Sequence, residues 1–148
     1  MYIKLRMAHE NDWDFILKLR NQFYNIAFFD QKKLITKNEH FEYMQKHIKN
    51  PDFFHWIASS EKIDIGYIRI LDEDVSIMVE EKFHNKGVGT IMLKLLENEA
   101  RSFKIKKLKA KLGYLLHWIG LIGTCFMLVV SFLDQSQDEL MIHLIENL

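Results

Sequence analysis

Residues 75–90 constrain this chain more than any other segment. An apolar run, Val75–Val79, leads through a short charged loop to Gly87 and Gly89, after which a helical pattern begins. A strand that enters a helix in this way leaves several backbone N–H groups unpaired at the positive end of the helix dipole. The two glycines let an anion approach the main chain closely, and Lys86 adds a positive charge. The segment therefore predicts a binding site for a diphosphate.

Two common phosphate-binding loops do not fit the spacing of these glycines. A P-loop has four residues between its first glycine and a Gly-Lys-Ser/Thr sequence, which this segment lacks. A Rossmann fingerprint needs a third glycine three residues after Gly89, where Met92 stands. An ordinary strand-to-helix turn that contains glycine is the alternative to a binding site.

The segment resembles the acyl-CoA signature of the GNAT superfamily of N-acetyltransferases. That signature is Gln/Arg-x-x-Gly-x-Gly/Ala between a strand and a helix. Residues 84–89 give His-Asn-Lys-Gly-Val-Gly, with histidine in the Gln/Arg position. The resemblance implies that acetyl-CoA is the cosubstrate and that the segment binds it mainly through backbone amides. The predicted cofactor contacts are His84, Asn85, Lys86, Gly87, Val88, Gly89 and Thr90.

The same resemblance implies a site for the acetyl group on the strand before the loop. In this superfamily a bulge opens that strand, and one backbone N–H donates to the thioester carbonyl as it becomes an oxyanion. By position the donor is Ile77, Met78 or Val79. The sequence leaves open which of the three it is.

Acetyl transfer also needs a base, because an acceptor ammonium has a pKa of about 10 and only the neutral amine attacks. Some GNAT members have a catalytic glutamate at the start of the same strand, and Glu73 holds that position. Two alternatives stay open: Asp72-Glu73-Asp74 is a solvated turn, or a chain of water molecules replaces the base. The tyrosine that the family uses as general acid is not in place, since Tyr114 comes too early.

Two short sequences bear on the acceptor. Leu19-Arg20-Asn21 and Glu39-His40 resemble the amino-sugar N-acetyltransferases of bacterial surface-sugar pathways. The resemblance implies that Arg20 and His40 bind the substrate, by hydrogen bonds to sugar hydroxyls or to a nucleotide phosphate. Surface or capping roles are the alternative for both residues.

Composition excludes several other classes of protein. Lys and Arg total 20, as do Asp and Glu, so no net charge favours nucleic acid or an anionic membrane. Cys125 is the only cysteine, which excludes a disulfide scaffold and predicts a reducing, cytoplasmic location. None of the seven histidines has metal-ligand spacing, so no metal is expected. The expected partner is a small-molecule amine or amino sugar, and a homodimer is left open.

The apolar pattern predicts a series of short elements within one domain over residues 1–148. Helices are predicted from Asn11 or Asp12 to Asn25, from a Thr36–Glu39 capping box to Asn50-Pro51, and over 88–103. The first helix is expected to have Trp13, Ile16, Leu17 and Phe23 on one side. Strands are predicted at 2–7, 53–59, 63–71, 75–79, 107–112 and 138–145. This order resembles the GNAT fold, which implies an α+β architecture: a mixed, mostly antiparallel sheet flanked by helices on both faces.

Residues 112–133 depart from that pattern, because they contain no charged side chain and are long enough to cross a bilayer. Three glycines and His117 interrupt the run, which favours a buried helix over 114–123 and a core strand over 126–133. Three functions stay open: an N-acetyltransferase, a CoA-binding protein without catalysis, and a membrane-associated or partner-binding protein that uses this segment.

Overall fold

The computed structural model describes residues 1–22, 24, 33–105, 107–111 and 127–131. Its centre is a sheet in the order β1-β2-β3-β4-β5-β6, so that strands adjacent in sequence are adjacent in space. Neighbouring strands pair antiparallel except β4 and β5, which pair in parallel. The strands are β1 (Lys4–Met7), β2 (Phe53–Ser60), β3 (Ile63–Leu71), β4 (Asp74–Val79), β5 (Lys107–Lys111) and β6 (Met127–Ser131).

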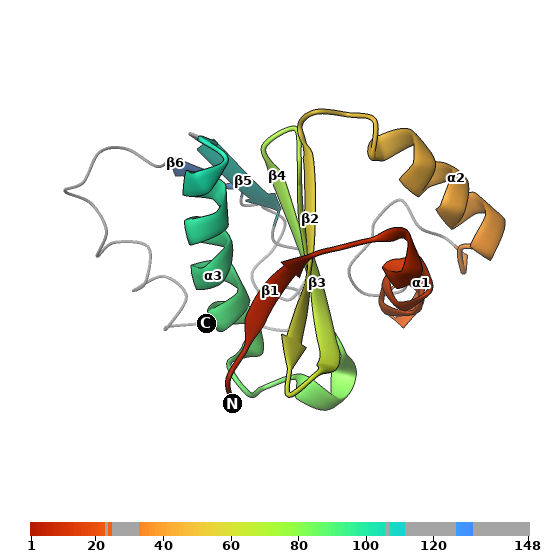
Figure 1. Ribbon diagram of the computed structural model, residues 1–148, viewed down its shortest axis with the longest axis horizontal. Helices are drawn as coiled ribbons and strands as arrows, with labels where there is room; N and C mark the ends of the chain where they lie inside the picture. Colours follow the sequence, from red (N-terminus) through yellow and green to blue (C-terminus); the bar gives the residue numbers. More distant parts are fainter. Residues whose placement is uncertain (23, 25–32, 106, 112–126, 132–148) are drawn as a thin grey trace, which may run out of the picture.

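Helices lie on both faces of this sheet (Figure 1). One face carries α1 (Trp13–Gln22), which follows the 3-10 turn η1 (Glu10–Asp12), and α2 (Lys37–His47). The other face carries α3 (Val88–Ser102), which follows the 3-10 turn η2 (Glu81–Phe83). The predicted α+β fold, with a mixed and mostly antiparallel sheet between helices, is confirmed.

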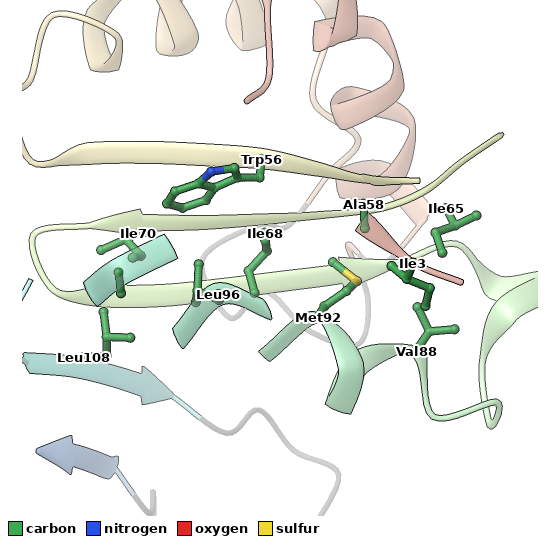
Figure 2. Packing of buried hydrophobic residues seen from close by; sticks show 11 residues of the cluster. Ile3, Trp56, Ala58, Ile65, Ile68, Ile70, Val88, Met92, Leu96 and Leu108 are labelled. Carbon is green, nitrogen blue, oxygen red and sulfur yellow. The ribbon is translucent and has the colours of Figure 1, made fainter. Parts of the chain in front are cut away.

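Side chains that alternate along β2 and β3 divide the core into two clusters. On the α3 side, Trp56 of β2 and Ile68 and Ile70 of β3 face the helix (Figure 2). The helix meets them with a stripe of buried residues at every fourth position, which is one face of a helix. This stripe fixes the orientation of α3, and so of its first turn; it consists of Val88, Met92, Leu96 and Ala100.

The second cluster holds α1 and α2 against the opposite face. Its buried members include Trp13, Ile16, Leu19, Met44, Ile57, Tyr67 and Met78. Leu17, predicted on the same side of α1 as Trp13 and Ile16, is half-buried, because the fully buried positions continue at three-residue spacing from Ile16 to Leu19. Phe23, which was placed on the same side, lies outside the described residues.

Local hydrogen bonds at the starts of α1 and α2 show where the two helices begin. At α2 the predicted capping box is present: Thr36 Oγ1 accepts from the Glu39 N–H at 3.3 Å, and the Glu39 carboxylate accepts from the Thr36 N–H at 2.8 Å. At α1 the predicted capping residue was wrong, because helical turns begin earlier and His9 is the N-cap. Asp12 instead accepts from the His9 N–H at 2.8 Å and binds Arg6 of β1 at 2.8 Å.

The boundaries of the central strands agree closely with the sequence pattern. β3 spans the predicted residues, β2 and β4 are each one residue longer, and the described part of the predicted strand 126–133 is β6. The predicted helix over 114–123 and the last strand over 138–145 fall outside the described residues, as does most of the candidate membrane segment. In the part of the chain that the structure describes, no helix combines the length and the apolar character that a bilayer span needs.

Candidate active site

The loop between β4 and α3 ends in a set of backbone donors, residues 87–90, which we name the cradle. Gly87 is the N-cap of α3, and the Ile91 N–H makes the first bond within the helix, to the Gly87 carbonyl at 3.1 Å. The amides of Val88, Gly89 and Thr90 therefore have no acceptor inside the helix. Because they lie at the positive end of the helix dipole, they suit an anion such as a diphosphate.

The two glycines of the cradle serve different purposes. Gly87 has a φ of +70°, in the left-handed region that glycine adopts without strain. Gly89 carries no such requirement. A Cβ built at either position would meet no described atom within 4 Å, so the space beside the cradle is open. Glycine is needed at 87 for the shape of the chain, whereas at 89 it has open space beside it.

The loop before the cradle is held by its own side chains. His84, the departure from the GNAT signature, lies with its Nε2 2.8 Å from the Val79 backbone oxygen and so joins the loop to the end of β4. Asn85 has a φ of 57°, which asparagine tolerates better than most residues. Lys86 lies with its Nζ 5.6 Å from the centre of the Phe83 ring. These contacts give the loop a defined shape.

β4 has an open edge next to this loop. It pairs with β5 at Asp74 and Val75, opposite Lys109 and Ala110. Beyond Val75, β4 pairs with no described residue on the side away from β3, where the described part of β5 ends at Lys111. Residues 76–79 on this side are the open edge, as far as the described residues define it.

The register between β3 and β4 decides which predicted donor faces this edge. In an antiparallel pair, alternate residues exchange both hydrogen bonds with their partners, and the residues between them point away. The Glu80 N–H donates to the Ile65 carbonyl at 2.9 Å, so in the same register Met78 exchanges bonds with Tyr67. The N–H of Met78 is therefore occupied. The predicted donors that point to the open edge are Ile77 and Val79.

The bulge expected in β4 is absent. Within β3 and β4, both described in full, the pairing runs without a shift from Leu71–Asp74 to Gly66–Val79. A shift occurs instead between β2 and β3, at Ala58/Ser59. Among the described residues, the N–H groups of β4 that point away from β3 beyond Val75 meet no paired strand, which is the kind of backbone group that a bulge would expose.

A pocket of about 340 Å³ lies between α1, α2 and the strands β3 and β4. Both residues predicted to bind the acceptor, Arg20 and His40, line this pocket. Met78 also lines it, so β4 borders the pocket with one side chain and the open edge with the amides on either side of that residue. The other lining residues are Ile16, Lys33, Ile35, Glu39, Tyr43, Met44, Tyr67 and Arg69.

Comparison with known families agrees with this geometry. A sequence model described as the "Acetyltransferase (GNAT) family" matches residues 13–114, which include α1, the pocket, β4 and the cradle. The chain belongs to the GNAT family. The predictions of an acyltransferase, of acetyl transfer to an amine and of acetyl-CoA as cosubstrate are thereby confirmed.

Solved structures of N-acetyltransferases share the fold of this GNAT chain. Spermidine N-acetyltransferase from Vibrio cholerae, solved in complex with CoA and spermine, is 17% identical, with a TM-score of 0.66 over 79% of this chain and 75% of that chain. Ribosomal-protein-alanine N-acetyltransferase from Brucella melitensis is 21% identical, with a TM-score of 0.64 over 74% of each chain. At these identities the likeness establishes the fold and leaves the acceptor open. Among curated proteins, no match to the chain was found.

His40 differs from the other side chains of the pocket because it is buried, 4% exposed, and its Nε2 has no hydrogen-bond partner among the described residues. Burial lowers the pKa of the ring below its ordinary 6.5, and the charge of Arg20 lowers it as well. A backbone hydrogen bond with Trp13 opposes this shift, and since Nε2 has no partner we assign that bond to Nδ1. A neutral ring that donates from Nδ1 presents Nε2 as an acceptor.

Sequence reasoning missed four polar residues of the pocket wall, Lys33, Tyr43, Tyr67 and Arg69. The Arg69 guanidinium donates to the Tyr43 hydroxyl at 2.7 Å. Burial raises the pKa of Tyr67, so its hydroxyl stays protonated. Two-residue spacing does place Tyr67 and Arg69 on one face of β3, but the sequence does not say which face meets α1 and α2.

The structure does not bring Glu73 to the pocket. Glu73 follows Asp72 in the exposed turn between β3 and β4, with a φ of 70°, at the end of β4 opposite the cradle. It is not among the residues that line the pocket. This position agrees with the alternative of a solvated turn, and the role of Glu73 as a base stays a prediction.

A buried carboxylate connects the pocket side of the molecule with the loop. Glu80 follows β4 directly, and its side chain is 11% exposed. Its Oε1 lies 2.6 Å from Lys18 Nζ of α1, and its Oε2 lies 2.9 Å from Lys82 Nζ of η2. The two ammonium groups lower the pKa of the Glu80 carboxyl below its ordinary 4.5. No local sequence signal indicated this bridge, because Lys18 and Glu80 are 62 residues apart.

Proposed function

We propose that this enzyme acetylates the primary amine of a small acceptor, and that the acceptor is an amino sugar. One observation carries the proposal: Met78 lines a pocket of about 340 Å³ while the amides on either side of it point to the open edge of β4. An amine held in the pocket and a thioester laid along the edge would meet at one strand. Such an arrangement holds both reactants in a fixed orientation, which is a large part of the catalysis of a two-substrate reaction.

Three groups of residues divide the task under this proposal. The amides of Val88, Gly89 and Thr90 bind the diphosphate of acetyl-CoA. The N–H of Ile77 or Val79 donates to the thioester carbonyl as negative charge develops on its oxygen. Acetyl-CoA itself supplies the activated acetyl group. The remaining contacts predicted on the loop, His84, Asn85 and Lys86, flank the same ligand.

Arg20 and His40 are the proposed acceptor contacts. Both line the pocket, and His40 offers Nε2 as a hydrogen-bond acceptor while Arg20 offers donors. The other residues of the two amino-sugar-like sequences have structural partners. Asn21 makes two hydrogen bonds of 2.9 Å with the backbone of Ile35, and Glu39 belongs to the cap of α2. The case for a sugar acceptor therefore depends on the pair Arg20 and His40.

The base is assigned either to Glu73 or to a chain of water molecules. If Glu73 is the base, Glu73→Gln lowers kcat most at low pH, where few acceptor molecules have already lost their proton. Profiles of kcat against pH for the wild type and the variant test this assignment. Parallel profiles would dismiss Glu73 and favour water.

A panel of amines with acetyl-CoA, followed by release of free thiol, tests the proposal. The panel contains glucosamine, a nucleotide-linked amino sugar, spermidine and an alanine-terminated peptide. We expect the amino sugars to give the highest kcat/KM. Turnover of spermidine or the peptide alone would remove the sugar and keep the transferase. Binding of acetyl-CoA without thiol release for any amine would identify a catalytically silent member.

The proposal includes a single domain over residues 1–148 and a cytoplasmic location, in keeping with Cys125 as the sole cysteine. It leaves the homodimer open. Partition of the purified protein into detergent would count against it and would favour a membrane role for residues 112–133, most of which lie outside the described part.

A further inference from the structure

The pocket has little negative charge to offer a ligand. Glu39 is the one carboxylate among the described residues that line it. Its oxygens accept from the Thr36 N–H and the Thr36 hydroxyl, both at 2.8 Å, and from Lys33 Nζ at 3.0 Å. The bonds from Thr36, and to a lesser degree the one from Lys33, lower the pKa of Glu39 to about 2. The carboxylate is ionised; Thr36 holds it at the cap of α2, and the ammonium of Lys33 offsets its negative charge.

Positive charge, in contrast, is presented to the pocket by Arg69. This half-buried residue of β3 donates to the Tyr43 hydroxyl at 2.7 Å, and its guanidinium lies 6.0 Å from the centre of the Tyr43 ring. Both contacts are with a neutral side chain. A guanidinium has five N–H donors in a planar fork that matches a carboxylate or a phosphate. Arg20 and Lys33 line the same pocket and add to its positive field.

His40 is the one residue of the pocket lining with a buried polar side-chain atom that has no partner among the described residues. Its Nε2 is buried and has no partner among the described residues, although an unsatisfied buried polar atom costs about 1–3 kcal/mol. Less than 1 Å² of this atom is accessible, so a ligand donor must displace a neighbouring side chain slightly to reach it. A ligand that donates to His40 and accepts from Arg69 would satisfy both residues.

We propose, on the basis of the acetyl transfer proposed above, that the acceptor is an amine that also carries an anionic group, a carboxylate or a phosphate, and that Arg69 binds this group. The anion occupies the β3 side of the pocket, and the amine lies toward Met78 and the open edge of β4. In the register of the sheet Arg69 is opposite Ser76, two residues before Met78. Two residues along a strand span about 7 Å, which sets the scale of the separation between anion and amine.

The proposal excludes polyamines as preferred acceptors. A polyamine carries several ammonium groups, and each needs a carboxylate or another acceptor when it leaves water. Among the described residues Glu39 is the one carboxylate that lines the pocket, and Lys33 already forms an ion pair with it. This GNAT chain therefore differs from the Vibrio cholerae enzyme, which was solved in complex with CoA and spermine.

A series of three amines with the same chain tests the charge preference directly. The three are 6-aminohexanoate, 6-amino-1-hexanol and 1,6-diaminohexane, whose far ends are anionic, neutral and cationic. We expect kcat/KM with acetyl-CoA to fall in that order, with at least a tenfold difference between the first and the last. Glucosamine 6-phosphate and glucosamine form a second pair, which gives the gain in kcat/KM from a phosphate. Comparison with the gain of 6-aminohexanoate over 6-amino-1-hexanol shows whether a phosphate or a carboxylate is the preferred anion.

Variants at Arg69 connect the preference to this residue. Arg69→Gln should bring the ratio of kcat/KM for 6-aminohexanoate to kcat/KM for 1,6-diaminohexane close to one. Arg69→Lys should keep part of the preference for 6-aminohexanoate. Arg101→Gln is the matched control, because Arg101 lies on α3 outside the pocket and binds Glu97 at 2.7 Å. It should keep the full ratio. Thermal unfolding and acetyl-CoA affinity check that each variant folds.

The outcomes separate this inference from the function on which it rests. Equal or faster turnover of 1,6-diaminohexane, or an unchanged ratio in folded Arg69→Gln, overturns the inference and leaves acetyl transfer intact. Failure to acetylate any amine overturns the proposed function. In that case calorimetry decides the inference: in the presence of CoA, glucosamine 6-phosphate must bind at least tenfold more tightly than glucosamine, and a smaller difference overturns it.

Discussion

The cradle and the pocket are built in different ways. The cradle belongs to one continuous stretch of main chain, in which β4, η2 and the first turn of α3 follow one another within residues 74–90. The pocket is built from side chains of several elements that the fold brings together. One region offers N–H groups that nearly every residue has, whereas the other depends on the identity of its side chains.

This difference separates what a family shares from what each member selects. Backbone amides at a helix start bind a diphosphate whatever side chains surround them, so one cosubstrate can serve a whole family. The acceptor is selected by a few polar side chains in a pocket. A likeness in fold at 17% identity to the Vibrio cholerae enzyme is therefore compatible with a different acceptor.

Substitution of Gly66 has the largest expected effect. Gly66 lies on β3 opposite Val79 of β4, the strand that both regions share. A Cβ on Gly66 would lie 2.8 Å from the Met78 backbone oxygen and 3.0 Å from Met92 Sδ. Met92 can rotate, but the Met78 oxygen moves only if β4 moves. We expect Gly66→Ala to lower the free energy of unfolding by about 1–3 kcal/mol. We also expect it to weaken acetyl-CoA binding and acceptor turnover together.

Urea unfolding, calorimetry with acetyl-CoA and the thiol assay measure the three effects of Gly66→Ala. If only one of the two binding functions changed, β4 would not be the common support of both regions. The comparison of cradle and pocket would then need another structural basis.

Gly89→Val tests the cradle alone. The added side chain enters the open space beside the amides, so we expect the acetyl-CoA dissociation constant to rise at least tenfold, or about 1.4 kcal/mol. Asn38→Val is the matched control, since Asn38 is exposed at the same second position of α2. Unchanged affinity in folded Gly89→Val, measured by calorimetry, would remove the diphosphate from the cradle. Gly87→Val should weaken binding too, with an added cost from its left-handed backbone.

The cradle could be predicted because its signal is local. Two glycines at the junction of a strand pattern and a helix pattern already specify unpaired amides, and the structure has them at Val88, Gly89 and Thr90. The capping box of Thr36 and Glu39 was predictable for the same reason, since three residues contain the whole motif.

His40→Gln tests the pocket alone. Loss of the imidazole acceptor should lower kcat/KM for the acceptor about three- to tenfold at pH 7 and leave acetyl-CoA affinity unchanged. The pKa of His40 is lowered by burial, so the ring accepts at pH 7 and loses this capacity as the pH falls through a value below 6.5. Asp14 and Arg20 are the charged groups that act on His40, and the other charged or titratable residues that line the same pocket are Lys33, Glu39, Tyr43, Tyr67 and Arg69.

The pH profile separates a ligand contact at His40 from a purely structural role. The acid limb of kcat/KM below pH 6.5 should be present in the wild type and shallower in His40→Gln. His55→Gln is the control: His55 is also buried, 7% exposed, and burial lowers its pKa to about 4, but it does not line the pocket. Identical profiles for the wild type and His40→Gln would contradict the contact.

The pocket was less predictable because it depends on which faces meet. The sequence indicated Arg20 and His40, but Tyr67 and Arg69 become pocket walls only because α1 and α2 pack on their face of β3. The choice of Ile77 and Val79 over Met78 required the register with β3, which joins residues far apart in the chain. Long-range pairing of this kind leaves no local pattern to read.

Glu80→Gln has the smallest expected effect and tests the connection between the two regions. The wild-type carboxylate bridges Lys18 of α1 and Lys82 of η2, and both lysines are largely exposed. Ion pairs with exposed partners contribute about 0.2–1 kcal/mol to stability. We therefore expect Glu80→Gln to lower the free energy of unfolding at pH 7 by an amount in that range. Glutamine keeps the shape of the side chain and removes only the charge.

The pH dependence shows whether the charge of Glu80 is the cause. Because Lys18 and Lys82 lower its pKa in the folded protein below 4.5, the contribution is fully present above pH 4.5 and is lost as the pH falls through the lower folded value. The difference between wild type and Glu80→Gln in urea unfolding should therefore be constant from pH 7 to 5 and shrink toward pH 3. Glu97→Gln removes an ion pair on α3 away from both regions and is the control for these unfolding measurements. A loss of stability that persisted undiminished at pH 3 would mean that glutamine disturbs the packing between α1 and the end of β4, and that the bridge itself contributes nothing.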